Sequence, residues 1–131
     1  MKELFLKVLD SNMNSCNGGS MKWTLTKNIT VKGKIKICKN GIHLTLDPKS
    51  WSGKRIFIAQ TNKVYDFQED GIKAVCRTAK LLLELSPNQL KTYDEGRAPL
   101  WKTYNEGCAQ LLKTYKEGCQ TILSKIMDGS L

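Results

Sequence analysis

The residues best suited to chemistry by type and spacing lie in segment 38–51. His43 and Thr45 are two residues apart in a predicted strand, so we expect their imidazole and hydroxyl groups on one face of it. Pro48 then turns the chain, and Trp51 can return over that face as a flat surface for stacking. An imidazole, a hydroxyl and an indole together suit the binding of a polar, partly aromatic ligand such as a nucleotide.

Two arginines extend this predicted site. Arg55 begins the next predicted strand, and Arg77 lies in a later stretch that also carries Lys80. The planar guanidinium group of arginine binds phosphate through paired, charge-assisted hydrogen bonds. We therefore predict one ligand-binding site, formed by His43, Thr45, Trp51, Arg55 and Arg77.

Signatures of catalytic and metal sites are missing from the sequence. It contains no G-x-S-x-G, G-x-x-x-x-G-K-[ST] or H-E-x-x-H motif. Its five cysteines include no C-x-x-C pair and His43 is the single histidine, so we expect no metal, no cofactor and no disulfide framework. The sequence favours binding over turnover, and the alternative is an enzyme that processes ADP-ribose or a related nucleotide through His43.

Basic residues dominate the charge. The 131 residues include 21 Lys and Arg against 12 Asp and Glu, a formal net charge of +9. Residues 1–85 hold 15 basic and 7 acidic side chains, so nearly all of the surplus lies there. We expect an anionic partner, first of all a small phosphate-bearing nucleotide. The second choice is nucleic acid, with phosphates bound by Lys22, Lys27, Lys32, Lys34, Lys36 and Lys39.

Membrane and export signals are also missing. The longest apolar runs, such as Leu81–Leu83, are far shorter than the roughly 18 residues of a membrane span. The start of the chain, Met1–Lys7, carries an acid and a base where a secretory signal would be apolar. We expect a cytoplasmic protein without a membrane partner.

The chain divides near residue 86. Ser86, Pro87 and Gln89 supply the N-cap, first-position proline and capping-box residue of a helix. Before them, runs rich in Val, Ile, Thr and aromatic residues predict strands at 4–9, 23–31, 34–38, 43–46, 55–60 and 64–67, whereas 72–85 fits either a helix or a basic strand. We predict an α+β protein, with a small antiparallel β-sheet head at 1–85 and one or two long C-terminal helices at 86–131.

An eleven-residue repeat fills the C-terminal part. Its units, each of the form Lys-Thr-Tyr-x-Glu-Gly, are Lys91–Gly96, Lys102–Gly107 and Lys113–Gly118. Eleven residues make three helical turns, so equivalent residues align in stripes along one helix. Each unit contains a glycine, which weakens a helix by about 1 kcal/mol relative to alanine. Close approach of another helix is the natural compensation.

These stripes predict self-association. We expect a helix from Pro87 to about Met127, kinked or divided at Pro99, whose apolar seams hold a homo-oligomer together. The alternative is a hairpin, broken near Gly96–Pro99, that folds back on the sheet of its own chain. That arrangement predicts a monomer.

The order of several motifs resembles a family of small phage and prophage proteins, in which a β-rich head precedes helical repeats. The resemblance covers roughly residues 6–123, and Asn17 stands where the family usually has the histidine of His-Gly-Gly. The residues that carry it are Ser15-Cys16-Asn17-Gly18-Gly19, Trp23, Cys38-x-x-Gly41-x-His43-Leu44-Thr45, Pro48, Trp51, Arg55 and Arg77-x-x-Lys80-Leu81-Leu82.

The plan of a β-rich head with oligomerising helices also looks like that of the Thoeris anti-defence proteins of phages. Those proteins sequester cyclic ADP-ribose or cyclic dinucleotide immune signals. The similarity implies a phage protein that binds and sequesters a nucleotide-derived signal in the host cytoplasm, without catalysis. An anti-CRISPR-like or nucleic-acid-binding protein is the alternative.

Overall fold

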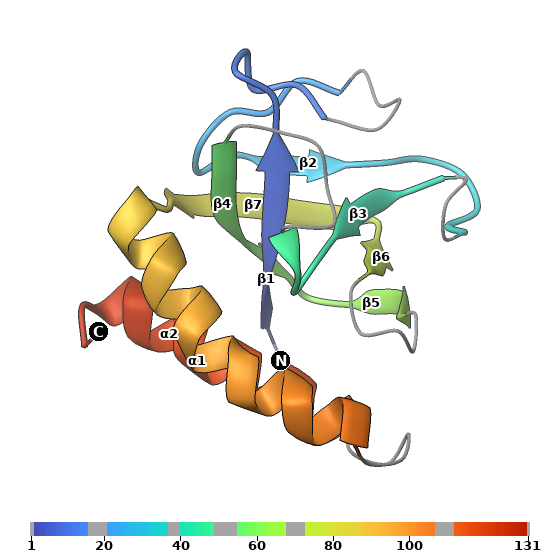
Figure 1. Cartoon of the computed structure of the whole chain (residues 1–131). Helices are drawn as coiled ribbons and strands as arrows, with labels where there is room; N and C mark the ends of the chain where they lie inside the picture. The colour runs from blue at the N-terminus through green and yellow to red at the C-terminus, as the bar shows by residue number, and fades with distance from the viewer. Residues whose placement is uncertain are drawn as a thin grey trace. The chain divides into compact units, whose positions relative to one another are not determined.

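The computed structural model describes residues 2–15, 21–36, 40–48, 55–67, 73–106 and 112–130. The chain forms two compact units, Met1–Glu84 and Leu85–Leu131. In the described residues the first unit contains antiparallel sheets of four and three strands, and the second contains two helices (Figure 1). The predicted α+β class, with a β-rich head followed by C-terminal helices, is confirmed.

The strands of the first unit pair in two sheets. The larger sheet has the order β1-β4-β7-β2, formed by β1 (Glu3–Leu9), β4 (Arg55–Thr61), β7 (Thr78–Glu84) and β2 (Asn28–Thr30). The smaller sheet has the order β3-β6-β5, formed by β3 (Ile42–Leu44), β6 (Ala74–Cys76) and β5 (Val64–Phe67). All of these neighbouring strands are antiparallel.

Backbone contacts join the two sheets into a ring. β6 runs into β7 with Arg77 alone between them. Leu6 in β1 and Thr45 after β3 exchange N–H···O bonds of 2.8 Å in both directions. A closed path therefore runs from β1 through β4, β7, β6 and β3 back to β1, by strand pairing at each step except from β7 to β6, which are consecutive in the chain. Such closure limits the number of open strand edges in a small sheet protein.

Both faces of the paired strands β1 and β4 are buried along the middle of each strand, which forms the core of the first unit. The register sets Phe5 opposite Ala59 and Lys7 opposite Phe57, so the four side chains share one face. All four are buried, and Lys7 has only 4% of its surface exposed. Its ammonium group donates a 2.9 Å hydrogen bond to the His43 carbonyl oxygen and lies 5.6 Å from the ring centre of Trp23. These contacts compensate for the burial of the charge.

Most predicted strands are observed. Segments 4–9, 43–46, 55–60 and 64–67 correspond to β1, β3, β4 and β5, and the stretch 72–85, which the sequence left open, contributes β6 and β7. The predicted strand 23–31 is confirmed only in part, as Asn28–Thr30, and the described part of 34–38 is not a strand but forms an isolated bridge, Lys36 with Asn40. The cause is that loop carbonyls at 31–34 accept hydrogen bonds from side chains rather than from a strand.

The second unit consists of α1 (Pro87–Glu106) and α2 (Leu112–Asp128). The predicted helix start is confirmed, because the Ser86 N–H donates to Gln89 Oε1 at 2.9 Å and the Gln89 N–H donates to Ser86 Oγ at 3.1 Å. One uninterrupted helix is not formed. A break at Gly96–Pro99 is also wrong, since α1 continues through Pro99 for seven further residues.

Glycines of the repeat lie where the two helices touch. A Cβ atom on Gly96 would be 2.9 Å from Cδ1 of Ile122, and one on Gly118 would be 2.7 Å from Cδ1 of Leu100. Both distances are too short for real Cβ contacts, so each glycine permits a close approach. The close helix contact that was expected to compensate for the helical glycines is therefore present, and it forms between two helices of one chain.

Candidate functional site

Thr45 serves the fold with its hydroxyl group. Its Oγ1 atom donates to the Asp47 carbonyl oxygen at 3.1 Å and accepts from the Asp47 N–H at 2.9 Å. The residue is only 1% exposed. The hydroxyl thus organises the turn that follows the bridge to Leu6, and it is not presented to a ligand as the sequence predicted.

Arg55 is engaged by a carboxylate. Its Nε atom donates to Glu84 Oε2 at 2.8 Å and its Nη2 atom donates to Glu84 Oε1 at 2.7 Å, a paired contact between β4 and β7. These hydrogen bonds also lower the pKa of the Glu84 carboxyl. The N–H groups of Arg55 that were predicted to bind phosphate already donate to the Glu84 carboxylate.

The predicted site residues do not form one cluster. Arg55 pairs with Leu9 on one edge of β1, whereas Thr45 bonds to Leu6 on the opposite edge. Trp51 lies outside the described residues. The idea that one pocket gathers His43, Thr45 and Arg55 is therefore replaced by a different grouping around Arg77.

His43 lies in β3, opposite Val75 of β6, and is half-buried. Burial is the main cause that lowers the pKa of its imidazole, and the positive charges of Lys7 and Lys73 lower it further. A hydrogen bond with the Gly41 backbone opposes these effects. The imidazole is consequently disfavoured as a cation.

Arg77 joins three segments of the first unit. From the junction of β6 and β7, its Nη1 and Nη2 atoms donate to the carbonyl oxygens of Val31 and Gly33, each at 2.8 Å. Its Nε atom makes a longer contact, 3.4 Å, with the hydroxyl oxygen of Tyr65 in β5. Arg77 thus fixes a basic loop beside an aromatic ring.

Tyr65 is the centre of this arrangement. It is 42% exposed, with the Lys63 ammonium group 4.5 Å and the Arg77 guanidinium carbon 5.7 Å from its ring centre. The hydrogen bond from Arg77 is the main cause that lowers the pKa of the Tyr65 hydroxyl, and the charges of Lys63 and Arg77 add to it. The lowered pKa reflects a positive potential around an exposed ring.

The loop held by Arg77 adds further cations. Lys32, Lys34 and Lys36 are exposed on it. The Asn40 side chain donates to the carbonyl oxygens of Lys32 at 2.9 Å and Lys34 at 3.0 Å, and Gly33 between them has a positive φ of 88°. We name Lys63, Tyr65, Arg77 and loop 31–36 the Tyr65 cluster. It combines an exposed aromatic ring with exposed ammonium groups, which are suited to stacking and to the binding of anions.

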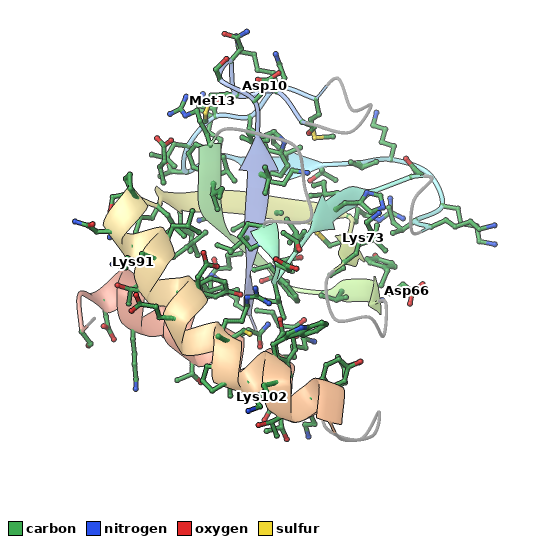
Figure 2. All side chains as sticks on the ribbon, in the orientation of Figure 1. Asp10, Met13, Asp66, Lys73, Lys91 and Lys102 are labelled. Carbon is green, nitrogen blue, oxygen red and sulfur yellow. The ribbon has the colours of Figure 1, made fainter. Side chains whose placement is uncertain are left out.

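Figure 2 labels two neighbours of the Tyr65 cluster, Asp66 in β5 and Lys73 before β6. Asp66 directly follows Tyr65 and reduces the positive charge of β5, while Lys73 adds to that of the region. Among the described residues of this region, Asp66 is outnumbered by Lys63, Lys73 and Arg77. An anionic ligand is therefore the one that this surface favours.

Sequence reasoning missed Lys63 and Tyr65. A usable signal was present, because a lysine two positions from a tyrosine can reach its ring. What the sequence did not show is that Arg77, twelve residues later, reaches the same ring.

The described part of the chain also bears on metal binding and on membrane insertion. It contains no group of three or more His, Cys, Asp or Glu residues placed to hold a metal ion. Cys76 and Cys119 are buried thiols there. Neither helix of that part has the length and apolar character needed to cross a membrane.

Comparison with known proteins gives one family. The profile described as Domain of unknown function (DUF7666) matches residues 4–92, more than half of the 131 residues. The matched span includes the whole Tyr65 cluster. No curated protein and no solved structure matches the chain.

Proposed function

We propose that this chain, which belongs to the DUF7666 family, binds a phosphate-bearing nucleotide at the Tyr65 cluster. The observation that carries the proposal is the exposed Tyr65 ring beside the charges of Lys63 and Arg77. A surface cation on an aromatic ring contributes only about 0.5–1 kcal/mol, so the fold gains little from these two contacts, and the ring remains accessible to a ligand.

The parts of a nucleotide have matching partners in this cluster. A base can stack on the Tyr65 ring or on the guanidinium plane of Arg77. Phosphates can accept from Lys63 and from the loop lysines, whose long side chains can move toward a ligand. Arg77 has five N–H donors, of which the contacts with described residues engage three, so it can contribute as well.

The biological role that we propose is sequestration of the nucleotide without turnover. The resemblance to phage proteins and to the Thoeris anti-defence plan supports a nucleotide-derived immune signal as the ligand and the host cytoplasm as the place. In this role affinity rather than catalysis is required. We also propose that the protein is a homo-oligomer assembled through its C-terminal helices.

Nucleic-acid binding is the second candidate. It is favoured by one observation, the exposure of alternate lysines at positions 32, 34 and 36 along a fixed loop, which could follow a phosphate backbone. The dependence of affinity on salt concentration distinguishes the two kinds of ligand. Binding that spans several phosphates falls steeply with salt, by a slope of about 0.7 per phosphate for single strands, whereas a single nucleotide gives a shallow slope.

Calorimetric titration tests the proposal directly. The probes are ADP-ribose, cyclic ADP-ribose, a cyclic dinucleotide and a single-stranded oligonucleotide. If stacking contributes, Tyr65→Ala weakens nucleotide binding roughly tenfold or more, in line with about 1–3 kcal/mol per stacked base. Lys22→Ala is the control, because Lys22 is an exposed lysine whose backbone bridges to Asn14 away from the cluster.

Two results would overturn the proposal. One is the absence of binding by every nucleotide probe at millimolar concentration. The other is nucleotide affinity that is the same in Tyr65→Ala, Lys63→Ala and Lys22→Ala. Binding of the oligonucleotide alone, with a steep salt dependence, would favour the second candidate.

A further inference from the structure

Loop 31–36 has its carbonyl oxygens bound by side chains of the protein itself. Arg77 donates to the carbonyl oxygens of residues 31 and 33, each at 2.8 Å. The Asn40 side chain donates to those of residues 32 and 34, at 2.9 Å and 3.0 Å. Four successive carbonyl groups are thus bound alternately by a guanidinium group and an amide group. The acceptor side of these four peptide units therefore faces donors of the protein.

The N–H groups of the same peptide units face the other way. In a planar trans peptide unit the N–H group points opposite to the carbonyl of the preceding residue. None of the described peptide bonds is cis. Each N–H group of residues 32–35 therefore points away from the side chain, Arg77 or Asn40, that binds the carbonyl of its peptide unit. Among the described residues, none accepts a hydrogen bond from these four N–H groups.

Backbone hydrogen bonds fix both ends of this segment. The Val31 N–H donates to the Arg77 carbonyl oxygen at 2.8 Å, and Lys36 and Asn40 exchange N–H···O bonds of 2.9 Å in both directions. Between these two points the chain bends at Gly33, whose positive φ of 88° suits glycine. A backbone that is already ordered loses less conformational freedom when a ligand binds. The orientation of the N–H groups is consequently set before binding.

Exposed N–H groups beside cations suit a phosphate. Lys32, Gly33, Lys34 and Lys36 are exposed, and Ile35 is half-buried. Successive backbone N–H groups in turns bind anions, as in phosphate-binding loops. Lysine ammonium groups add point charges that attract the same ligand. Water can also accept from these N–H groups, but the positive charge of the loop favours an anion.

We infer that loop 31–36 binds the phosphate of the ligand through its backbone N–H groups, and that Asn40 is a positioning residue that keeps these groups turned outward. The inference rests on the proposed function, because it names the part of the Tyr65 cluster that binds the phosphate. The base then lies on the Tyr65 ring. A backbone site recognises the phosphate group rather than the base, so ligands that share this group should share these contacts.

Nuclear magnetic resonance of the ¹⁵N-labelled full chain tests the phosphate contact. The probes are ADP, adenosine, which lacks the phosphates, and inorganic pyrophosphate. We expect ADP and pyrophosphate to shift the amide resonances of residues 32–35, and adenosine to leave them unchanged. If ADP shifts the Tyr65 resonance and none of residues 32–35, the inference is wrong and the proposed function stands.

Two other outcomes concern the nucleotide. If pyrophosphate shifts the amide resonances of residues 32–35 while ADP and adenosine leave Tyr65 unchanged, the phosphate site stands and nucleotide binding at Tyr65 is wrong. If none of the three probes shifts any resonance of the Tyr65 cluster at millimolar concentration, both proposals are wrong.

The variant Asn40→Ala tests the positioning role. Loss of the two donations to the loop should weaken ADP binding roughly threefold to tenfold and leave the affinity for adenosine unchanged. The ratio of the two affinities is the readout, because a general loss of folded structure would lower both. Asn12→Ala is the control, since Asn12 is exposed and the hydrogen bond from its N–H to Asp10 is kept. An unchanged ratio in Asn40→Ala would overturn the role of Asn40.

A glycine variant tests the loop without removing a donor. In Gly33→Ala the new Cβ atom would lie 3.2 Å from Nδ2 of Asn40, at a φ of 88° that L side chains rarely adopt. We expect ADP affinity to fall by a factor similar to that of Asn40→Ala. Gly129→Ala is the matched control, because Gly129 has a φ of 80° and no described atom within 4 Å of the added Cβ. Equal ADP affinity in the two glycine variants would contradict binding by the loop backbone.

Discussion

Each unit of the protein contains an arginine bound to a tyrosine, and the two pairs behave in opposite ways. In the β-rich unit, Arg77 and Lys63 lower the pKa of the exposed Tyr65. In the helical unit, burial is the main cause that raises the pKa of Tyr115, although Arg97 donates a hydrogen bond to it. The same residue types thus give a charged surface where water reaches them and a structural core where it does not.

The two pairs differ in how much of the tyrosine is exposed to solvent. Tyr65 has 42% of its surface exposed to solvent, whereas Tyr115 has 1%. The first pair can respond to a ligand, and the second can respond only to a change in folding or assembly. Four experiments test whether the two pairs differ in this way.

Overpacking the helix contact should have the largest effect. Gly118→Val places side-chain atoms where Leu100 already lies, because even a Cβ atom would be 2.7 Å from it. We expect a loss of about 1–3 kcal/mol in the free energy of unfolding, measured by urea denaturation. Ser124→Val, at an exposed position of the same helix, should cost well under half as much. Equal losses would show that the close approach at Gly118 does not matter.

Shortening the arginine of the exposed pair should have a smaller effect on stability. Arg77→Lys removes the paired donation to Val31 and Gly33, and we expect it to cost about 1 kcal/mol because the group is partly exposed. Lys63→Ala, which removes the other cation near the Tyr65 ring, should change stability by less than about 0.5 kcal/mol. Nucleotide affinity should fall in both. A binding defect confined to Arg77→Lys would assign the ligand to the loop rather than to the ring.

Acid should weaken the β-rich unit through His43. The pKa of this imidazole is lowered in the folded state, mainly by burial, so the unfolded chain binds the proton more readily. Stability is therefore complete above the ordinary histidine pKa of about 6.5 and declines as the pH falls through the lowered value. Chemical denaturation between pH 7 and pH 5 should show the decline in wild type and not in His43→Asn. An equal decline of stability with pH in wild type and in His43→Asn would show that His43 is not its cause.

Tyrosine titration offers the finest measurement. Absorbance near 295 nm should show one hydroxyl, that of Tyr65, ionising below the ordinary tyrosine pKa of about 10. Tyr93 and Tyr115 should ionise well above it, because burial raises the pKa of both. Tyr65→Phe should abolish the early step, and Tyr115→Phe should preserve it. Persistence of the early step in Tyr65→Phe would remove the electrostatic argument for the cluster.

Local patterns were sufficient for much of the fold. The capping residues Ser86 and Gln89 act within four positions of each other, so the helix start could be predicted from the sequence. Strands rich in β-branched and aromatic residues, such as Arg55–Thr61, were likewise visible, as were the glycines that allow close helix contact. In each case the deciding interaction is short-range or is encoded by residue size and periodicity.

The tertiary structure alone decided which arginine is available to a ligand. Arg55 and Arg77 look alike in the sequence, but Arg55 meets Glu84, 29 positions away, whereas Arg77 meets carbonyl oxygens 46 and 44 positions before it and the ring of Tyr65. Strand pairing likewise settled that the ambiguous stretch 72–85 forms β6 and β7, since β3 and β4 supply its hydrogen-bond partners. Composition determined that the first unit is basic. Only contacts between distant segments determined that positive charges lie beside the exposed Tyr65 ring. The register of the paired strands, and not residue type, decides which residues become neighbours.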